Sequence, residues 1–226
     1  MKAQAPKTKV KSEATRIRIM DAALKLFRER GFEATTVREI AESAGVATGA
    51  AYYYFDSKDA IVLAFYDLAQ KDMADRLEGV LDASRDLGER LRGILQVKLD
   101  YFEPSRRLLG ALSAHTNPSH PLSPFSAETR EIRENDIRFF ARALDGSRVR
   151  VPDDLHAYLP RLLWMYQMGI ILFWINDGSP NQKKTQALMV KSLEVVVRLI
   201  KLTSLPLTKP LRRMIIDLVD TVTEGT

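Results

Sequence analysis

The sequence of 226 residues contains no cysteine, so it can form neither disulfide bonds nor thiolate metal sites. Long apolar runs are scarce as well. The longest, residues 162–175, contains Gln167 and is shorter than the roughly 20 residues that span a bilayer, so we interpret it as a buried helix. Strand-like alternation of apolar and polar residues is missing too, because apolar residues recur at spacings of three and four. These absences favour an all-helical protein with no membrane partner.

The composition is that of an ordinary globular protein, with 46% hydrophobic and 28% charged residues. The N-terminus carries lysines but no apolar run. We therefore expect no secretory signal and a cytoplasmic location.

Charge is concentrated at the N-terminus. The first eighteen residues contain a single acid, Glu13, and the cations Lys2, Lys7, Lys9, Lys11, Arg16 and Arg18. This segment accounts for the whole net charge of +5. We expect residues 1–14 to form a flexible basic arm. A basic arm suits the DNA backbone, and on charge alone a solvated tail is equally compatible.

Helical periodicity covers most of the remaining chain, which predicts an all-α fold. The segments with this periodicity are residues 15–30, 36–44, 48–55, 58–81, 87–102, 105–114, 128–144, 155–175, 182–202 and 211–222. Proline-rich residues 115–124 and the polar residues 145–152 and 176–180 are expected to be loops.

Two short helices joined by a tight turn carry the functional signal. Thr36 to Glu39 form a capping box, in which the threonine hydroxyl and the glutamate each bond the other's backbone N–H. Gly45 ends this helix after about two turns, and a second short helix follows at 48–55. Two such helices need a third to bury their apolar faces, and residues 15–30 supply it. This pattern predicts a helix-turn-helix unit, whose second helix enters the DNA major groove.

The second helix has residues suited to that role. Thr48, Gly49 and Ala50 are small, so the backbone can approach bases and phosphates. The consecutive Tyr52, Tyr53 and Tyr54 cannot all face a small core, because successive helical residues lie about 100° apart. For Tyr52 and Tyr53 we favour DNA contact over core packing. For Tyr54 the two roles are equally compatible.

Residues 18–65 resemble the DNA-binding domain of the TetR family of bacterial regulators. The matching residues are Ile19-Met20-Asp21-Ala22-Ala23, Leu26-Phe27, Arg30-Gly31-Phe32, Thr35-Thr36-Val37, Ile40-Ala41, Ala44-Gly45-Val46, Tyr52, Tyr54-Phe55 and Ser57-Lys58. The resemblance implies an N-terminal three-helix helix-turn-helix domain at residues 15–62, followed by a larger helical ligand-binding and dimerisation domain at residues 63–226.

The resemblance also implies roles for single residues. DNA contacts are expected from Thr36, Arg38, Thr48, Gly49, Ala50, Tyr52, Tyr53 and Lys58. Among them, Arg38 would reach a base edge, and Thr36, Tyr53 and Lys58 would meet phosphates. Ala47 and Ala51 depart from the serine and leucine usual in the family. Both departures bear on the angle of the recognition helix.

Apolar helices and aromatic residues in the larger, C-terminal part of the chain predict dimerisation and ligand binding. The helices near 155–175 and 182–202 are apolar around much of their circumference, so we expect them to pair in a homodimer, with the core of a monomer as the alternative. Aromatic and other residues are candidates for an apolar ligand cavity: Tyr101, Phe102, His115, Phe125, Phe139, Phe140, Trp164 and Met168. Taken singly, each of these residues is more typical of plain core. The three histidines lack metal-ligand spacing, so we expect no metal and no cofactor.

These features predict a regulator that binds double-stranded DNA and is not an enzyme. We expect a repressor that a small apolar or aromatic effector releases from a palindromic operator. The alternatives are an all-α enzyme or carrier that uses the C-terminal cavity, and a DNA-organising protein without a ligand.

Overall fold

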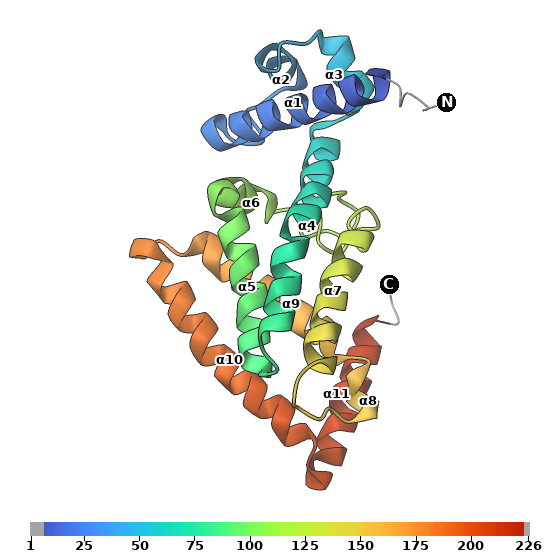
Figure 1. The fold of residues 1–226 in the computed structure, drawn as a ribbon, viewed down its shortest axis with the longest axis vertical. Coiled ribbons are helices and arrows are strands. Elements are labelled where there is room, and N and C mark those ends of the chain that lie inside the picture. Colours follow the sequence, from blue (N-terminus) through green and yellow to red (C-terminus); the bar gives the residue numbers. More distant parts are fainter. Residues whose placement is uncertain (1–6, 224–226) are drawn as a thin grey trace, which may run out of the picture. The chain divides into compact units, whose positions relative to one another are not determined.

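The structure is a computed structural model, and it describes residues 7–223. Every regular element in this part of the chain is a helix (Figure 1). The α-helices are α1 (Lys7–Arg30), α2 (Val37–Ser43), α3 (Thr48–Tyr54), α4 (Lys58–Ala83), α5 (Leu87–Phe102), α6 (Arg106–Leu112), α7 (Arg130–Asp145), α8 (Asp153–His156), α9 (Leu159–Asn176), α10 (Lys183–Thr203) and α11 (Lys209–Thr223). Short 3₁₀ turns precede α6, α10 and α11. Between residues 7 and 223, no helix is both long enough and apolar enough to cross a membrane.

The chain divides into two compact units. The division does not fall between residues 62 and 63, where the sequence predicts the domain boundary. The first unit comprises residues up to Lys71 together with Glu103–Arg130, and the second comprises Asp72–Phe102 and the chain from Glu131 onward. The helix α4 runs unbroken through residue 62 and contributes to both units. The α6 segment joins the first unit because α6 packs against α1.

The helix α1 begins at Lys7, so the part of the expected flexible arm from residue 7 to residue 14 is helical instead. Residues 1–6, including Lys2, lie outside the described part. This first stretch of α1 has no apolar stripe that sequence periodicity could detect. The helix ends at Gly31, whose φ of 93° is open to glycine and costly for other residues.

The second unit contains the part of α4 from Asp72 onward together with α5 and α7 to α11, and α10 packs on both α5 and α9. The segment expected to form one helix over 155–175 is two helices instead. The turn α8 ends at His156, and α9 starts at Leu159 with Pro160 in its first turn. Proline lacks a backbone N–H and would clash with the carbonyl four residues earlier, so a helix restarts there.

One buried arginine joins the ends of two helices. Arg90 on α5 is 7% exposed. Its guanidinium donates to the carbonyls of Leu81 (2.6 Å) and Ser84 (2.6 Å) at the end of α4. It also donates to the carbonyls of Arg142 (2.9 Å) and Ala143 (3.2 Å) at the end of α7. A buried cation is tolerated here because four backbone carbonyl oxygens near the ends of two helices accept its protons.

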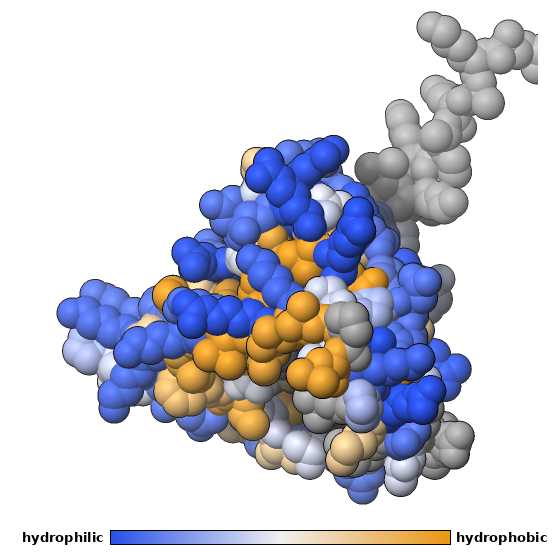
Figure 2. Space-filling view, turned by 90° about the horizontal axis from the view of Figure 1, so that it is seen from below, coloured by the Kyte–Doolittle hydropathy of each residue, from blue (hydrophilic) through white to orange (hydrophobic). Residues whose placement is uncertain are grey.

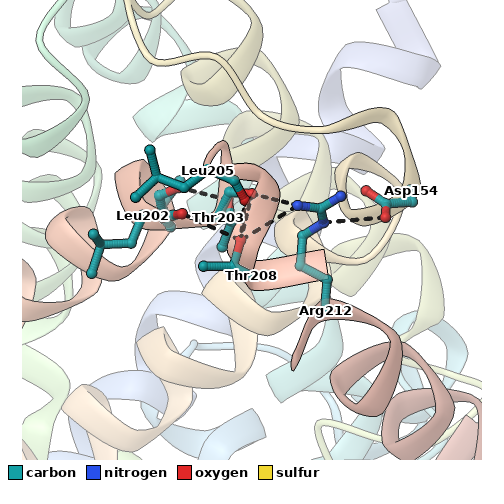
Figure 3. A network of polar contacts seen from close by, with 7 residues as sticks. Asp154, Leu202, Thr203, Leu205, Thr208 and Arg212 are labelled. Atoms are coloured by element: carbon teal, nitrogen blue, oxygen red, sulfur yellow. Dashed lines mark hydrogen bonds and ion pairs between the residues drawn. The ribbon is translucent and has the colours of Figure 1, made fainter. Parts of the chain in front are cut away.

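A second arginine fastens the C-terminal helix (Figure 3). Arg212 on α11 donates to the carbonyl of Thr203 at the end of α10 (2.7 Å) and to the carboxylate of Asp154 on α8 (3.2 Å). The hydroxyl of Thr208 donates to the carbonyl of Leu205 (2.7 Å) in the same turn. The sequence predicts an apolar stripe on α11, and of that stripe the side chains of Leu211, Ile215, Leu218 and Val222 lie outside the described part.

The turn between α9 and α10 depends on Asp177, which is 5% exposed. Its carboxylate accepts the N–H of Ser179 (2.9 Å) and both the N–H (2.8 Å) and the hydroxyl (2.7 Å) of Thr185. Burial alone would raise the pKa of Asp177, but these hydrogen bonds from Ser179 and Thr185 outweigh it and hold the pKa well below its usual range.

Replacing Asp177 with asparagine tests this turn through its pH dependence. A group whose pKa is depressed by folding stabilises the folded state above its unfolded pKa, about 3.9, and loses that stabilisation as the pH falls further. We expect Asp177→Asn to unfold at lower denaturant concentration than the unmodified protein at pH 7, with the difference shrinking below pH ~4. Asp75→Asn, at an exposed position on α4, is the control. A deficit independent of pH would contradict this account.

Candidate nucleic-acid interface

The turn between α2 and α3 is set by Gly45. This residue has a φ of 64°, in the left-handed region. Its N–H donates to the carbonyl of Glu42 (3.0 Å), and the N–H of Val46 donates to the carbonyl of Ala41 (3.0 Å). Together these bonds form a Schellman motif, which satisfies the carbonyls at the end of α2 and redirects the chain into α3.

A small apolar cluster holds α3 against α2. Ala51 is 1% exposed and packs with Val37 and Ala41, and the partly buried Val46 of the turn packs against the same group. At the other end of α3, Phe55 is buried, and the guanidinium of Arg16 on α1 lies 5.0 Å from the centre of its ring. The three helices therefore fix the orientation of α3.

With Ala51 buried, α3 presents one open face. Thr48, Gly49, Tyr52 and Tyr53 are all exposed. Their spacing of one, three and one residues puts them on a single side of the helix. Tyr53 is 82% exposed and Tyr52 53%, whereas Ala50 and Tyr54 are half-buried. The sequence identified this face correctly as the side without a core role.

The start of α3 has no side-chain cap. Ala47 occupies the N-cap position, and its side chain bonds no backbone N–H. Thr48, the first residue of the helix, is exposed. The N-terminal backbone N–H groups of α3 thus adjoin the exposed face, where backbone donors are available to an acceptor.

The capping box at the start of α2 is confirmed. The hydroxyl of Thr36 accepts the N–H of Glu39 (3.3 Å), and the carboxylate of Glu39 accepts the Thr36 N–H (2.8 Å) and hydroxyl proton (2.8 Å). Arg30 pairs with the same carboxylate at 3.1 Å. The backbone N–H and hydroxyl of Thr36, together with Arg30, keep the pKa of Glu39 below its usual value. Both donors of Thr36 are therefore engaged within the unit.

The two expected cationic contacts differ in their surroundings. Arg38 is exposed in the first turn of α2. Lys58 is half-buried, and its ammonium donates to the carbonyls of Phe32 (2.7 Å) and Glu33 (3.4 Å) and lies 4.5 Å from the centre of the Phe32 ring. Lys58 thus fastens the loop between α1 and α2, and an ammonium with three donors retains capacity for a further acceptor.

The expected ligand-binding residues fall into two sets. His115 and Phe125 belong to the first unit, whereas Tyr101, Phe102, Phe139, Phe140, Trp164 and Met168 belong to the second. In the first set, Phe125 is 49% exposed. The ring of His115 stacks on His120 with 3.8 Å between centroids, and its Nε2 lies 4.0 Å from a carboxylate oxygen of Glu33.

In the second set, Phe140 and Trp164 are buried, and the other four are half-buried. The hydroxyl of Tyr101 donates to the carboxylate of Asp72 at 2.8 Å. Sequence reasoning missed the polar residues among these aromatics, which are Lys98, Asp136 and Gln167, each less than a tenth exposed. A signal existed, because each interrupts the apolar face of its helix. Among the described residues, no group of three or more histidine, aspartate or glutamate side chains is arranged to hold a metal ion.

Two family profiles match the chain. The profile described as bacterial regulatory proteins of the tetR family matches residues 19–65, and the profile of the tetracyclin repressor-like C-terminal domain matches residues 90–221. The fold and the interface define a helix-turn-helix regulator with a larger helical C-terminal part. The chain belongs to the TetR family of bacterial transcriptional regulators. Regulators of this family bind DNA and small molecules and act as dimers.

A curated relative is similar to this chain over a short stretch. The chain is 51% identical over 47 residues to the HTH-type transcriptional repressor KstR2 of Rhodococcus jostii, a match that covers 21% of this chain and 23% of that protein. The chain thus matches less than a quarter of this curated relative's length.

Solved structures share the fold across most of the chain. FadR of Bacillus subtilis in complex with stearoyl-CoA has a TM-score of 0.60 at 18% identity, over 80% of this chain and 97% of that one. The SmeT–triclosan complex has a TM-score of 0.60 at 20% identity, over 81% and 91% of the two chains. At this identity the likeness concerns the fold alone.

Tyr53, the more exposed of the two tyrosines on the α3 face, gives a first test. We expect Tyr53→Phe to weaken binding about tenfold and about equally at all DNA sites, because a phenol that bonds a phosphate reads no base. Binding to several DNA fragments measured by fluorescence anisotropy would check this, with Tyr158→Phe, in the second unit and outside the proposed DNA and effector contacts, as the matched control. Unchanged affinity would remove Tyr53 from the DNA contacts.

Arg38 should instead affect which sequence is bound. A guanidinium bonded to a base edge is worth about 1–3 kcal/mol of discrimination, so Arg38→Ala should bring preferred and altered sites closer in affinity by that amount. The control is Arg85→Ala, which removes the same charge from an exposed position of the second unit. Selection of bound fragments from a randomised pool measures the preference. A preference profile identical to that of the unmodified protein would argue against base contact.

Proposed function

We propose that this protein is a dimeric repressor that binds a palindromic operator through α3 and leaves it when a small apolar or aromatic molecule binds the second unit. The observation that carries the proposal is the open face of α3, where Thr48, Gly49, Tyr52 and Tyr53 are exposed while Ala51 anchors the opposite side. As a transcriptional repressor it would act in the cytoplasm, on the bacterial chromosome.

The proposed DNA contacts combine this face with its neighbours. They are Thr36, Arg38, Thr48, Gly49, Ala50, Tyr52, Tyr53 and Lys58. Glycine and alanine offer no side-chain hydrogen bonds, so base preference would depend on Arg38, Thr48, the tyrosines and DNA shape. For Thr36 to donate to a phosphate, its hydroxyl proton would have to leave Glu39, which now accepts it at 2.8 Å.

Dimerisation is proposed through α9 and α10. The side chains of Met165, Leu172 and Phe173 on α9 are between 41% and 54% exposed. On α10, Val195 is 56% and Leu199 57% exposed. Figure 2 shows apolar side chains gathered on one face and bordered by hydrophilic ones. Exposed apolar side chains on two neighbouring helices are typical of a face that a second protein covers, and two helices from each copy would form a four-helix bundle.

The proposed effector would bind among the aromatic residues of the second unit. Tyr101, Phe102, Phe139, Phe140, Trp164 and Met168 are the candidates there, with His115 and Phe125 as candidates from the first unit. Two neighbours of the same fold were solved with molecules that contain large apolar parts, the acyl chain of stearoyl-CoA in FadR and the aromatic rings of triclosan in SmeT. A ligand that binds the DNA-incompetent conformer more tightly shifts the population away from DNA.

Selection of genomic fragments with the purified full-length protein tests this function. We expect enrichment of a palindrome whose half-sites lie about 34 Å apart, the spacing of one turn of the double helix. Affinity for the recovered site should fall steeply with salt, since each phosphate contact contributes about −0.9 to the slope of log K against log salt. With folded protein at low salt, no enriched fragment would contradict the proposal.

The dimer has a separate test. A charge placed in an apolar interface must be desolvated, so Val195→Lys/Leu199→Lys should be monomeric at micromolar concentration while remaining helical. Sedimentation velocity measures the mass, and circular dichroism measures the helix content. Ile17→Lys makes the same kind of change at an exposed apolar residue of α1 and should remain a dimer. A double variant that is still dimeric would place the interface elsewhere.

A further inference from the structure

Three helices of the second unit bring polar side chains together inside its core. Lys98 on α5, Asp136 on α7 and Gln167 on α9 are 4%, 7% and 0% exposed. The ammonium of Lys98 lies 2.7 Å from one carboxylate oxygen of Asp136, and the amide Nε2 of Gln167 donates to the other at 3.1 Å. We call these residues the core triad.

One polar atom of the core triad lacks a hydrogen-bond partner in the protein. The amide oxygen Oε1 of Gln167 is buried and accepts no hydrogen bond from the protein. Exchanging the positions of the amide oxygen and nitrogen of Gln167 would not satisfy the group, because the oxygen would then face the carboxylate of Asp136 and the hydrogen bond from Nε2 would be lost. A buried acceptor without a donor is unfavourable, so this position is suited to a molecule that brings a donor to it.

The charges of the core triad restrict what that molecule can be. Lys98 and Asp136 neutralise each other, so a further charge buried here would have no counter-ion and would be penalised by desolvation. An ionised carboxylate also has no proton to donate to Oε1. A hydroxyl has one, and its lone pairs can accept from the Lys98 ammonium, which the shared carboxylate of Asp136 holds in the same cluster.

Each helix that contributes to the core triad also carries an aromatic residue close by in the sequence. Phe102 lies four residues after Lys98, Phe140 four residues after Asp136, and Trp164 three residues before Gln167. These spacings place each aromatic side chain on the same helix face as its polar neighbour. Phe140 is 1% and Trp164 4% exposed. An apolar molecule bound at the polar group would therefore meet aromatic side chains on all three helices.

We propose that the effector of this regulator is an uncharged alcohol or phenol on an apolar body, and that its hydroxyl donates to Oε1 of Gln167. This inference rests on the proposed function, because it names the chemistry of the effector. Neutral hydroxyl compounds are therefore expected to bind more tightly than fatty acids and other apolar carboxylates of the same size.

Two matched pairs of probes test the inference on the full-length dimer: 1-decanol against decanoate, and 4-phenylphenol against 4-phenylbenzoate. Titration calorimetry and thermal unfolding at pH 7.5 (about three units above the pKa of the acids, by the usual carboxyl values) measure binding. We expect the hydroxyl compound of at least one pair to bind and to raise Tm, and the matching acid to bind at least about tenfold more weakly, as the loss of one buried hydrogen bond requires.

Substitution of the acceptor gives the second measurement. Gln167→Met retains the length of the side chain and removes Oε1, so affinity for the hydroxyl probe should fall about tenfold. Gln96→Met is the matched control, because the amide of Gln96 also donates to an aspartate, Asp100 at 2.7 Å, but lies at the surface. The comparison of alcohol with acid needs no variant, so it stands even if Gln167→Met folds poorly.

The outcomes separate this inference from the proposed function. An acid that binds as tightly as its alcohol, unchanged affinity in Gln167→Met, or no binding of either hydroxyl probe overturns the inference. Release from the selected operator is measured independently. Release by an acid alone leaves the repressor function intact and overturns the inference. Binding of the hydroxyl probe through Gln167 without release from the operator supports a binding site at the core triad and overturns the inference that such a molecule is the effector.

Discussion

An all-helical chain must satisfy the backbone groups that each helix end leaves without partners, about four at each end. In this protein charged side chains meet much of that demand. Arg90 and Arg212 donate to carbonyls at the ends of α4, α7 and α10, and Lys58 does the same for the loop after α1. Asp177 accepts the N–H of Thr185 near the start of α10. The same bonds that complete the helices therefore also connect them, and this is how the packing of each unit is fixed.

The helix-turn-helix could be predicted from the sequence because the interactions that begin and end its helices join residues close together in the chain. Thr36 and Glu39 are three residues apart, and the Schellman motif at Gly45 involves only the adjacent turn. Such short-range chemistry leaves a pattern that needs no knowledge of tertiary contacts. The exposed and buried sides of α3 followed from the same logic, since Ala51 and Phe55 already occupied the core side.

What the sequence could not supply depends on residues far apart in the chain. Lys98 and Asp136 are 38 residues apart, and Arg212 and Asp154 are 58 apart. Neither residue of such a pair indicates in the sequence which residue is its partner. A lysine on an apolar helix face therefore has no evident role until the structure shows the carboxylate that it pairs with. The early start of α1 was missed for a different reason: a charged, exposed stretch can be helical without any apolar periodicity. The break before α9 was signalled by Pro160, but the surrounding apolar residues obscured it.

The first unit is assembled from two separate stretches of chain, because Glu103–Arg130 belongs with the residues before Asp72. The backbone thus leaves and re-enters this unit instead of passing through it once. A regulator that exchanged its DNA-binding part with a relative by a single crossover after α4 would keep its own α6 against a foreign α1, two helices that pack together here. The heritable module is accordingly larger than the helix-turn-helix and discontinuous in the gene. Substitutions on α1 and α6 are therefore expected to evolve as a pair, even where operator preference and effector preference diverge independently.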